Sequence, residues 1–361
     1  MLRLHVSQPL CWLFLETNEI KKSMNKETFP STMLAAIAEE FGEPSVLKPQ
    51  QVALPQLRPT DVLVRVAAAG LNRAEIFWRE GRYGAKPGYG DCDEIIGLEL
   101  AGTVVQVGAA VTNVRVGDRV MGLVGGGSYA QYARIDHRLC MPVPSNLSML
   151  EAGSIPEVMI TAHQMLMHLG QMKAGDRVLI HGAGGGVGTT MIQMAKAAGA
   201  SWIGATASSG KHNQLKALGV DCTIDYVAQD FEQEIASQAP GGKVDVIVCN
   251  MGGGYFERNM RSLALYGRLV QLGLQEGPKG AMPIDLLLRN CLSVSGSVMK
   301  SQSIEEKQAM TRRFCNRWFD ALVQGSLHIY IDTVYPLQEA AKAHKHLQNG
   351  KPFGKVVLDC R

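Results

Sequence analysis

The apolar positions between residues 33 and 135 fall into short groups separated by turn residues. In residues 61–69 the side chains of Val62, Val64 and Val66 alternate with other positions, as in a strand with one buried face. The other groups also have the length of strands: residues 33–41, 52–55, 100–107, 119–124 and 128–135. Several strands at such close spacing predict a β-rich barrel or sandwich.

The pattern changes at Pro156, because residues 156–172 show helical periodicity with Met and Leu on one side. The strands predicted after this point are residues 177–181, 202–207, 221–225, 244–248, 267–274 and 291–298, and the helices are residues 189–198, 212–218, 255–263 and 304–325. Residues 329–335 and 355–358 are predicted as short strands that return to the first domain. Alternating strands and helices predict an α/β fold with a parallel, doubly wound sheet. Residues 291–298 are expected at the far edge of that sheet.

These patterns predict a β-rich domain at residues 33–155, a nucleotide-binding domain at 156–290, and an edge strand and return to the first domain at 291–361. Residues 1–32 stand apart from this plan. Their apolar run, residues 10–15, is short for a signal-peptide core, and only Arg3 precedes it. A disordered extension or a misassigned start is therefore favoured over a targeting signal.

A glycine-rich turn follows the predicted strand at residues 177–181. It reads Gly182-Ala183-Gly184-Gly185-Gly186-Val187-Gly188. The order strand, turn and helix brings main-chain amides and a helix N-terminus to one place, which suits a pyrophosphate. Gly185 would let the phosphates approach, and Gly188 would let the helix pack closely on the strand. The turn predicts dinucleotide binding, and a glycine-rich turn without a ligand is the alternative.

The end of the next predicted strand indicates which dinucleotide binds. An NAD site usually has Asp or Glu there, whereas this chain has Thr206. Ser208, Ser209 and Lys211 follow, and their hydroxyls and ammonium suit a 2′-phosphate. The sequence therefore favours NADPH over NADH. The alternative is an ordinary helix start with a solvated lysine.

Composition excludes several other classes of protein. The net charge is +3, with no block of Lys or Arg, so neither nucleic-acid nor membrane binding is indicated. No apolar run reaches the roughly 18–20 residues that span a membrane. The eight cysteines include no C-x-x-C pair, which argues against a zinc lobe or a disulfide framework and favours a cytoplasmic protein.

Several motifs beyond the glycine turn carry a family resemblance. They are Gly70-Leu71-Asn72-Arg73-Ala74-Glu75, Gly97-Leu98-Glu99-Leu100-Ala101-Gly102, Val116-Gly117-Asp118-Arg119-Val120, Ile155-Pro156-Glu157, Thr161-Ala162, Leu265-Tyr266-Gly267-Arg268 and Gly354-Lys355-Val356-Val357-Leu358. Over residues 33–361 the chain resembles the medium-chain dehydrogenase/reductase superfamily. It is most similar to the zinc-free NADPH quinone oxidoreductase branch, of the zeta-crystallin-like and tumour-suppressor-inducible kind. The resemblance implies a Rossmann sheet inserted into a GroES-like catalytic domain.

The chain departs from the zinc-dependent relatives at the positions of their metal ligands. The early Cys position lies at Leu71-Asn72-Arg73, the G-H-E motif reads Gly97-Leu98-Glu99, and the third position lies near Glu157, without a thiol. Zinc needs about four nitrogen, sulfur or oxygen ligands in a tetrahedral array. We therefore expect no metal site.

The resemblance also assigns roles to single residues. It places Asn72 and Tyr83 beside the nicotinamide and substrate, and Thr161 beside the nicotinamide amide. The alternatives are a helix cap for Asn72, a loop aromatic for Tyr83 and a core hydroxyl for Thr161. A structural role is favoured for His181 at the end of the glycine-turn strand.

The coenzyme-binding residues implied by the resemblance lie in the α/β domain. Lys211 and Tyr226, with Ser208 beside them, match the ligands of the 2′-phosphate, although Tyr226 could instead serve packing. Asn250 and the glycines after it would flank the adenosine ribose. Gly185, Gly186, Val187 and Gly188 complete the expected set.

The expected function is NADPH-dependent hydride transfer to quinones or related conjugated carbonyls. One alternative is an enoyl-thioester or alkenal reductase, with Tyr83 as the proton donor. Another is a non-catalytic NADPH-binding protein, crystallin-like or RNA-binding. By analogy we expect a homodimer joined at residues 290–298, where Leu292, Val294 and Val298 are apolar.

Overall fold

The computed structural model describes residues 29–83, 95–350 and 352–361. The described chain forms two compact units. Unit 1 takes the described residues up to Glu157, together with Ile304–Ser326 and Ile331–Arg361. Unit 2 takes Val158–Ser303 and Leu327–Tyr330. The extension expected at residues 1–32 lies almost wholly outside the described residues.

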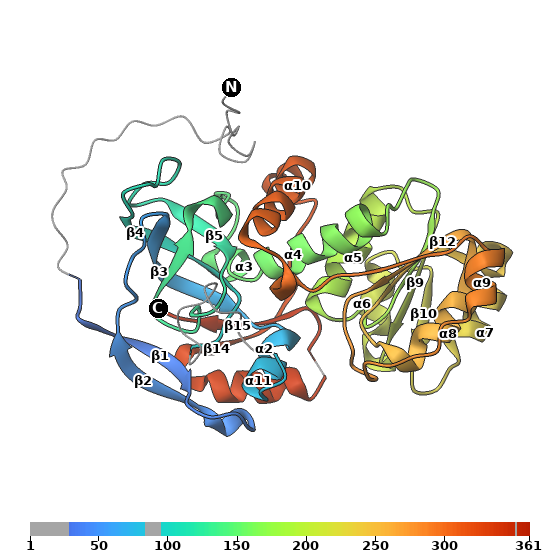
Figure 1. The fold of residues 1–361 in the computed structure, drawn as a ribbon, viewed down its shortest axis with the longest axis horizontal. Coiled ribbons are helices and arrows are strands. Elements are labelled where there is room, and N and C mark those ends of the chain that lie inside the picture. The colour runs from blue at the N-terminus through green and yellow to red at the C-terminus, as the bar shows by residue number, and fades with distance from the viewer. Residues whose placement is uncertain (1–28, 84–94, 351) are drawn as a thin grey trace. The chain divides into compact units, whose positions relative to one another are not determined.

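Unit 1 is built on a seven-stranded, largely antiparallel sheet with the order β14-β15-β3-β4-β5-β7, in which β6 also pairs with β3 (Figure 1). A separate hairpin joins β1 to β2. The elements are β1 (Thr32–Ala38), β2 (Leu47–Ala53), β3 (Asp61–Gly70), α2 (Arg73–Arg79), β4 (Glu99–Val107), β5 (Arg119–Leu123), β6 (Tyr132–Asp136), β7 (Cys140–Pro142), α3 (Met149–Ala152), α10 (Ile304–Val323), β14 (Ile331–Pro336), α11 (Ala340–Gln348) and β15 (Lys355–Asp359).

Strand β3 lies at the centre of unit 1, because it pairs with β4, β6 and β15. Its alternation predicted one buried face, but Leu63 is as buried as Val62 and Val64, and only Arg65 is exposed. Side chains on both faces of β3 are therefore buried. Strand β15, from the last residues of the chain, fills the place between β14 and β3.

Unit 2 contains a six-stranded sheet with the order β10-β9-β8-β11-β12-β13, and every pairing is parallel. This confirms the α/β class and the doubly wound sheet. The elements are α4 (Pro156–His163), β8 (Arg177–Ile180), α5 (Gly186–Ala197), β9 (Trp202–Ala207), α6 (His212–Ala217), β10 (Cys222–Asp225), α7 (Phe231–Gln238), β11 (Val244–Cys249), α8 (Gly253–Ser262), β12 (Leu263–Gln271), α9 (Ile284–Arg289) and β13 (Ser293–Gly296). The winding reverses between β8 and β11, and this switch point is where such sheets bind ligands. Strand β13 lies at the edge, as predicted.

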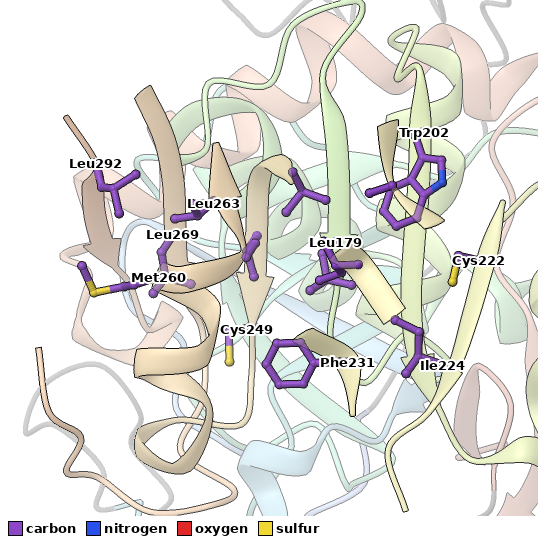
Figure 2. Packing of buried hydrophobic residues seen from close by; sticks show 14 residues of the cluster. Leu179, Trp202, Cys222, Ile224, Phe231, Cys249, Met260, Leu263, Leu269 and Leu292 are labelled. Atoms are coloured by element: carbon purple, nitrogen blue, oxygen red, sulfur yellow. The ribbon is translucent and has the colours of Figure 1, made fainter. Parts of the chain in front are cut away.

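The core of unit 2 forms where apolar strand residues meet the helices that cover them. Figure 2 shows Leu179 beside Phe231, with Trp202 and Leu269 in the same buried cluster. Strand β9 is buried along its whole length, as expected of a strand covered on both faces. The packing fixes the carboxyl ends of β8 and β11, which carry the glycine turn and Asn250.

Four helices were not predicted: α3, α7, α9 and α11. Each has nine residues or fewer, and α7 buries only Phe231 and Ile235, four positions apart. The helix predicted at residues 156–172 is an α-helix to His163 and then a π-helical segment, Gln164–Leu169. Among the described residues, no helix has both the length and the apolar character needed to cross a bilayer.

Candidate functional site

The glycine turn of unit 2 joins β8 to α5 at the switch point of the sheet. Gly182 has φ +63°, a left-handed conformation that suits glycine, and the Asn250 side chain lies against it where a Cβ would be. Gly185 is the N-cap of α5, which begins at Gly186. The first amides of that helix have no partners within the helix and are therefore available to an anion.

Two glycines of the turn provide the close packing and the open space that were predicted from the sequence. A Cβ on Gly188 would lie 2.5 Å from the backbone of Ala183, so only glycine lets α5 approach the turn so closely. A Cβ on Gly185 would meet nothing nearer than Gly182 O at 3.8 Å. The space beside Gly185 is therefore open, as a bound diphosphate requires.

Lys211 is a cation that lies beside this turn. Its side chain covers Gly184, where an added Cβ would collide with Lys211 Cδ. Ser208 precedes it as the N-cap of a short 3-10 helix, and Tyr226, after β10, is 48% exposed. These residues come from the ends of adjacent strands, where the adenosine end of a dinucleotide binds in such sheets.

Thr206 and Asp225 lie at the carboxyl ends of the adjacent strands β9 and β10. Thr206 is buried, and its hydroxyl accepts a 3.2 Å hydrogen bond from Gly182 N and lies 3.1 Å from His181 Nδ1. It therefore holds the turn in place. Asp225, a carboxylate that the sequence argument overlooked, ends the next strand. Hydrogen bonds from Val227 N and the Ser209 hydroxyl lower the pKa of Asp225, so one of the hydroxyls expected to meet a phosphate already has a partner.

Two buried oxygen atoms of unit 2 fit a ligand. Thr161 Oγ1 and Asn250 Oδ1 have no hydrogen-bond partner among the described residues, although both atoms are buried. Such atoms are costly unless a ligand or water pairs with them. Together with the open space at Gly185, they make this unit compatible with a bound nicotinamide dinucleotide.

His181 has a structural role, as predicted. Its Nε2 lies 2.8 Å from Asn259 Oδ1, and its ring packs edge-on against Phe231 and Tyr255. Burial lowers the pKa of His181 to about 4, so the ring is neutral at physiological pH.

Unit 1 holds a second polar centre, built around Asn72. Asn72 is the N-cap of α2, and its backbone N–H donates to Glu75. Its side-chain Nδ2 donates to Glu99 Oε1 at 3.0 Å, and its Oδ1 accepts from Lys355 Nζ at 2.7 Å. Lys355 also donates to Glu99 Oε1 at 2.6 Å, and both partners of this ion pair are buried. Asn72 can thus serve as the helix cap and also as the pocket residue that the resemblance implies, because its backbone makes the cap contact and its side chain faces the polar centre.

The carboxyl groups around Asn72 are strongly perturbed. Burial raises the pKa of Glu75 to about 7, opposed by the charge of Lys355. Burial and the nearby Glu99 raise the pKa of Glu157 to about 8. Glu99 Oε2 accepts from Glu157 N at 2.9 Å, so Glu99 is bonded through both of its oxygens. Buried titratable clusters of this kind are typical of functional sites.

A chain of hydrogen bonds leads from Glu75 deeper into unit 1. The Tyr129 hydroxyl bonds to Glu75 and lies 3.2 Å from His344 Nε2, while His344 Nδ1 lies 3.3 Å from Arg79 Nη1. Burial lowers the pKa of His344 to about 3. Since an arginine can only donate, Nδ1 accepts and Nε2 carries the proton that reaches Tyr129.

The donor set around Asn72 does not fit zinc. The three positions that would hold the metal carry Asn72, Leu98 and Glu157, so neither a thiolate nor an imidazole is offered. The Lys355 ammonium already lies on Asn72 Oδ1 and Glu99. In the part of the chain that the structure describes, no three His, Cys, Asp or Glu side chains are grouped to hold a metal ion.

Sequence reasoning placed Asn72 and Tyr83 in one pocket, and the structure describes both in unit 1. Tyr83 is partly buried and is the last described residue before residue 95. Glu75, Glu99 and Lys355 were quoted as motif residues without a role in the site. For Glu99 and Lys355 the signal was a single charged residue in an otherwise apolar segment, a pattern that indicates a buried polar network.

The comparisons with known proteins agree with this architecture. The alcohol dehydrogenase GroES-like domain family matches residues 58–145, and the zinc-binding dehydrogenase family matches residues 186–314. The synaptic vesicle membrane protein VAT-1 homolog of Rattus norvegicus is 30% identical over 314 residues, which cover 83% of this chain and 77% of that protein.

The chain belongs to the medium-chain dehydrogenase/reductase family. This confirms the resemblance inferred from the motifs and shows that the chain is an oxidoreductase of that family.

Other members of the family are similar over most of the chain. The quinone oxidoreductase from Coxiella burnetii superposes with a TM-score of 0.75 at 29% identity, covering 91% of this chain and 100% of that one. The CurK enoyl reductase superposes with a TM-score of 0.81 at 27% identity, covering 91% and 99%. A mycocerosic acid synthase-like polyketide synthase of Mycobacterium tuberculosis is 30% identical over 301 residues, and the chain spans only 14% of its length.

Proposed function

We propose that this medium-chain oxidoreductase transfers hydride from NADPH to a quinone or a related conjugated carbonyl, and that it does so without zinc. The observation that carries the coenzyme assignment is the open glycine turn at the switch point, with the Lys211 side chain lying over Gly184. The similarity to a quinone oxidoreductase supports the acceptor class.

In this proposal unit 2 binds and orients the coenzyme. The first amides of α5 hold the diphosphate, and Gly185 leaves room for it. Lys211, Ser208 and Tyr226 bind the adenosine end, and Lys211 supplies the positive charge for the 2′-phosphate. Thr161 Oγ1 and Asn250 Oδ1, the two buried oxygens, bind polar groups of the nicotinamide and ribose.

The bound nicotinamide supplies the hydride, and the protein supplies binding, orientation and a polar environment. A conjugated carbonyl that accepts hydride develops negative charge on its oxygen, which a fixed N–H donor stabilises. Asn72 is the residue of unit 1 proposed to give that N–H. Zinc is not needed for this step, since the acceptor is already electron-poor.

A screen of acceptors tests the proposal. NADPH and NADH oxidation are compared with benzoquinones, naphthoquinones, alkenals and enoyl thioesters. We expect turnover with quinones and a preference for NADPH. Faster turnover with NADH, or NADPH binding without turnover of any acceptor, would contradict it, and the second outcome would favour a non-catalytic NADPH-binding protein.

A second candidate is an enoyl-thioester reductase. The similarity to the CurK enoyl reductase and to a polyketide synthase supports it. This reaction also needs a proton for the α-carbon, and Tyr83 is the proposed donor. Turnover of enoyl thioesters at a higher kcat/KM than quinones, lost in Tyr83→Phe, would favour this alternative.

A further inference from the structure

Lys355 is a buried ammonium whose three hydrogens all have acceptors. Its Nζ donates to Leu71 O at 2.6 Å, Asn72 Oδ1 at 2.7 Å and Glu99 Oε1 at 2.6 Å. Only 2% of the side chain is exposed, and the paired Glu99 is fully buried. An ammonium has no hydrogen beyond these three, so Lys355 is fixed in position and in its hydrogen bonding.

This arrangement decides which way the Asn72 amide faces. Lys355 can only donate, so the Asn72 atom that it contacts must be the carbonyl oxygen, Oδ1. The ionised Glu99 can only accept, so the Asn72 atom at 3.0 Å from Glu99 Oε1 must be Nδ2. Lys355 and Glu99 therefore fix the orientation of the Asn72 amide. In a flipped amide, Nδ2 would face the Lys355 ammonium and Oδ1 would face the Glu99 carboxylate.

These contacts leave Asn72 with one side-chain N–H that makes only a weak hydrogen bond. One Nδ2 hydrogen is taken by Glu99, and the other has a 3.5 Å contact with Gly70 O, which is at the limit of a hydrogen bond. Asn72 is partly exposed as a residue, and this N–H is the one left for a substrate oxygen. Because Oδ1 accepts from an ammonium, the amide is polarised and its N–H is a better donor.

We propose that Lys355 is a positioning residue that makes Asn72 an obligatory hydrogen-bond donor to the acceptor's oxygen. The inference rests on the proposed function. It also bears on specificity, because an Asn72 side chain that offers the substrate an N–H and no acceptor atom favours an oxygen that gains negative charge. Quinones and enones have such an oxygen, whereas an alcohol bound for oxidation would bring a hydroxyl proton that Asn72 does not accept.

The surroundings support this role for the ion pair. Glu75 and Glu157 face the same network, and burial raises the pKa of Glu75 to about 7 and that of Glu157 to about 8, so near neutral pH each carries less than a full negative charge. Lys355 and Glu99 form the buried ion pair of the centre, and their charges offset each other. A developing oxyanion at Asn72 therefore meets a polarised donor with less negative charge around it than three ionised carboxylates would give.

A mutant cycle between the ion pair and Asn72 tests the proposal. The variants are Asn72→Ala, the double variant Lys355→Met/Glu99→Gln, and the triple variant, so that no unpaired charge is left buried. The readouts are the single-turnover rate of NADPH oxidation at saturating 1,4-benzoquinone, the KM for the quinone, the Kd for NADPH and the melting temperature. Arg134→Met/Asp61→Asn, which removes another ion pair of unit 1, is the matched control.

We expect the double variant to lower the single-turnover rate by about 10- to 100-fold, less than the roughly 100- to 1,000-fold for outright loss of an oxyanion donor, because Asn72 stays but is misplaced. Its Kd for NADPH should stay within about threefold, because the coenzyme-binding residues are untouched. In the Asn72→Ala background the same double change should cost less than about threefold, since the donor is already gone. The control pair should leave the rate unchanged whatever it does to the melting temperature.

Losses that multiply in the triple variant would overturn the proposal, because Lys355 would then not act through Asn72. Should the double variant fail to fold, Lys355→Arg is measured in the same two backgrounds. It keeps the charge, but its planar guanidinium does not meet three divergent acceptors, so its loss should likewise vanish without Asn72. A wild-type protein that binds NADPH and reduces no acceptor would overturn the proposed function as well.

Discussion

Replacing Lys211 by alanine separates the two coenzymes. The Lys211 side chain lies over Gly184 in the turn that is proposed to hold the diphosphate. A hydrogen bond between charged groups contributes about 1.5–3 kcal/mol, which corresponds to about 10- to 150-fold in Kd. Lys211→Ala should therefore weaken NADPH binding by that factor and change NADH binding less than about twofold.

The assay is a fluorescence or calorimetric titration with each coenzyme, at low and at moderate salt. The NADPH loss should shrink as salt rises, because screening weakens the interaction in the wild type. Lys216→Ala is the matched control, since Lys216 is an exposed lysine of the helix that follows Lys211. Equal losses for NADPH and NADH would refute the phosphate assignment, and Lys211 would then act through the shape of the turn.

Four further results are expected. Gly188→Val should abolish NADPH binding and lower the melting temperature, because the valine Cβ would lie 2.5 Å from the Ala183 backbone. The control Gly210→Ala should do neither, since the space around Gly210 is open. Normal NADPH binding by Gly188→Val would exclude this packing role. Glu157→Gln should become more stable relative to the wild type as pH rises from about 4.5 to about 8, by up to a few kcal/mol. The pKa of Glu157 is raised in the folded protein, so in this pH range the unfolded wild type loses a proton that the folded wild type keeps, and the wild type loses stability. Urea unfolding from pH 5 to 8 checks this, and parallel plots of unfolding free energy against pH for the two proteins would contradict it. Quinone reduction should survive prolonged treatment with a strong chelator, and activity that is lost and then restored by zinc would overturn the zinc-free proposal. Light scattering should give the mass of the proposed homodimer, and Leu288→Lys, at a 71% exposed position near the edge strand, should give the monomer; an unchanged mass would place the contact elsewhere.

The regular part of the fold was predictable because local patterns encode it. The strands and helices of unit 2 follow runs of apolar residues and the glycine turn, and their alternation leads directly to the parallel order. The close approach at Gly188 was also predictable, since only glycine fits where a helix packs on the preceding turn. The short helices were missed because α7 buries only two side chains, too few to make a period visible.

The polar centre of unit 1 could not be predicted from local sequence patterns. Lys355 and Glu99 are 256 positions apart, and no spacing rule joins them. The lysine reaches the glutamate because β15 inserts beside β3, and that pairing is long-range. Ser209 is a similar case, because its hydroxyl was expected to suit a phosphate from the sequence, but in the structure it bonds to Asp225 on the adjacent strand.

The place of β15 has a consequence for synthesis on the ribosome. Unit 2 is almost continuous along the chain, so its sheet can form while later residues are still being made. Unit 1 cannot, because the gap between β14 and β3 stays unfilled and Glu99 lacks its counter-charge until residues 355–359 emerge. The nascent protein therefore has a complete parallel sheet in unit 2 while the sheet of unit 1 still lacks β15, and the addition of β15 also brings Lys355 to Glu99 and Asn72.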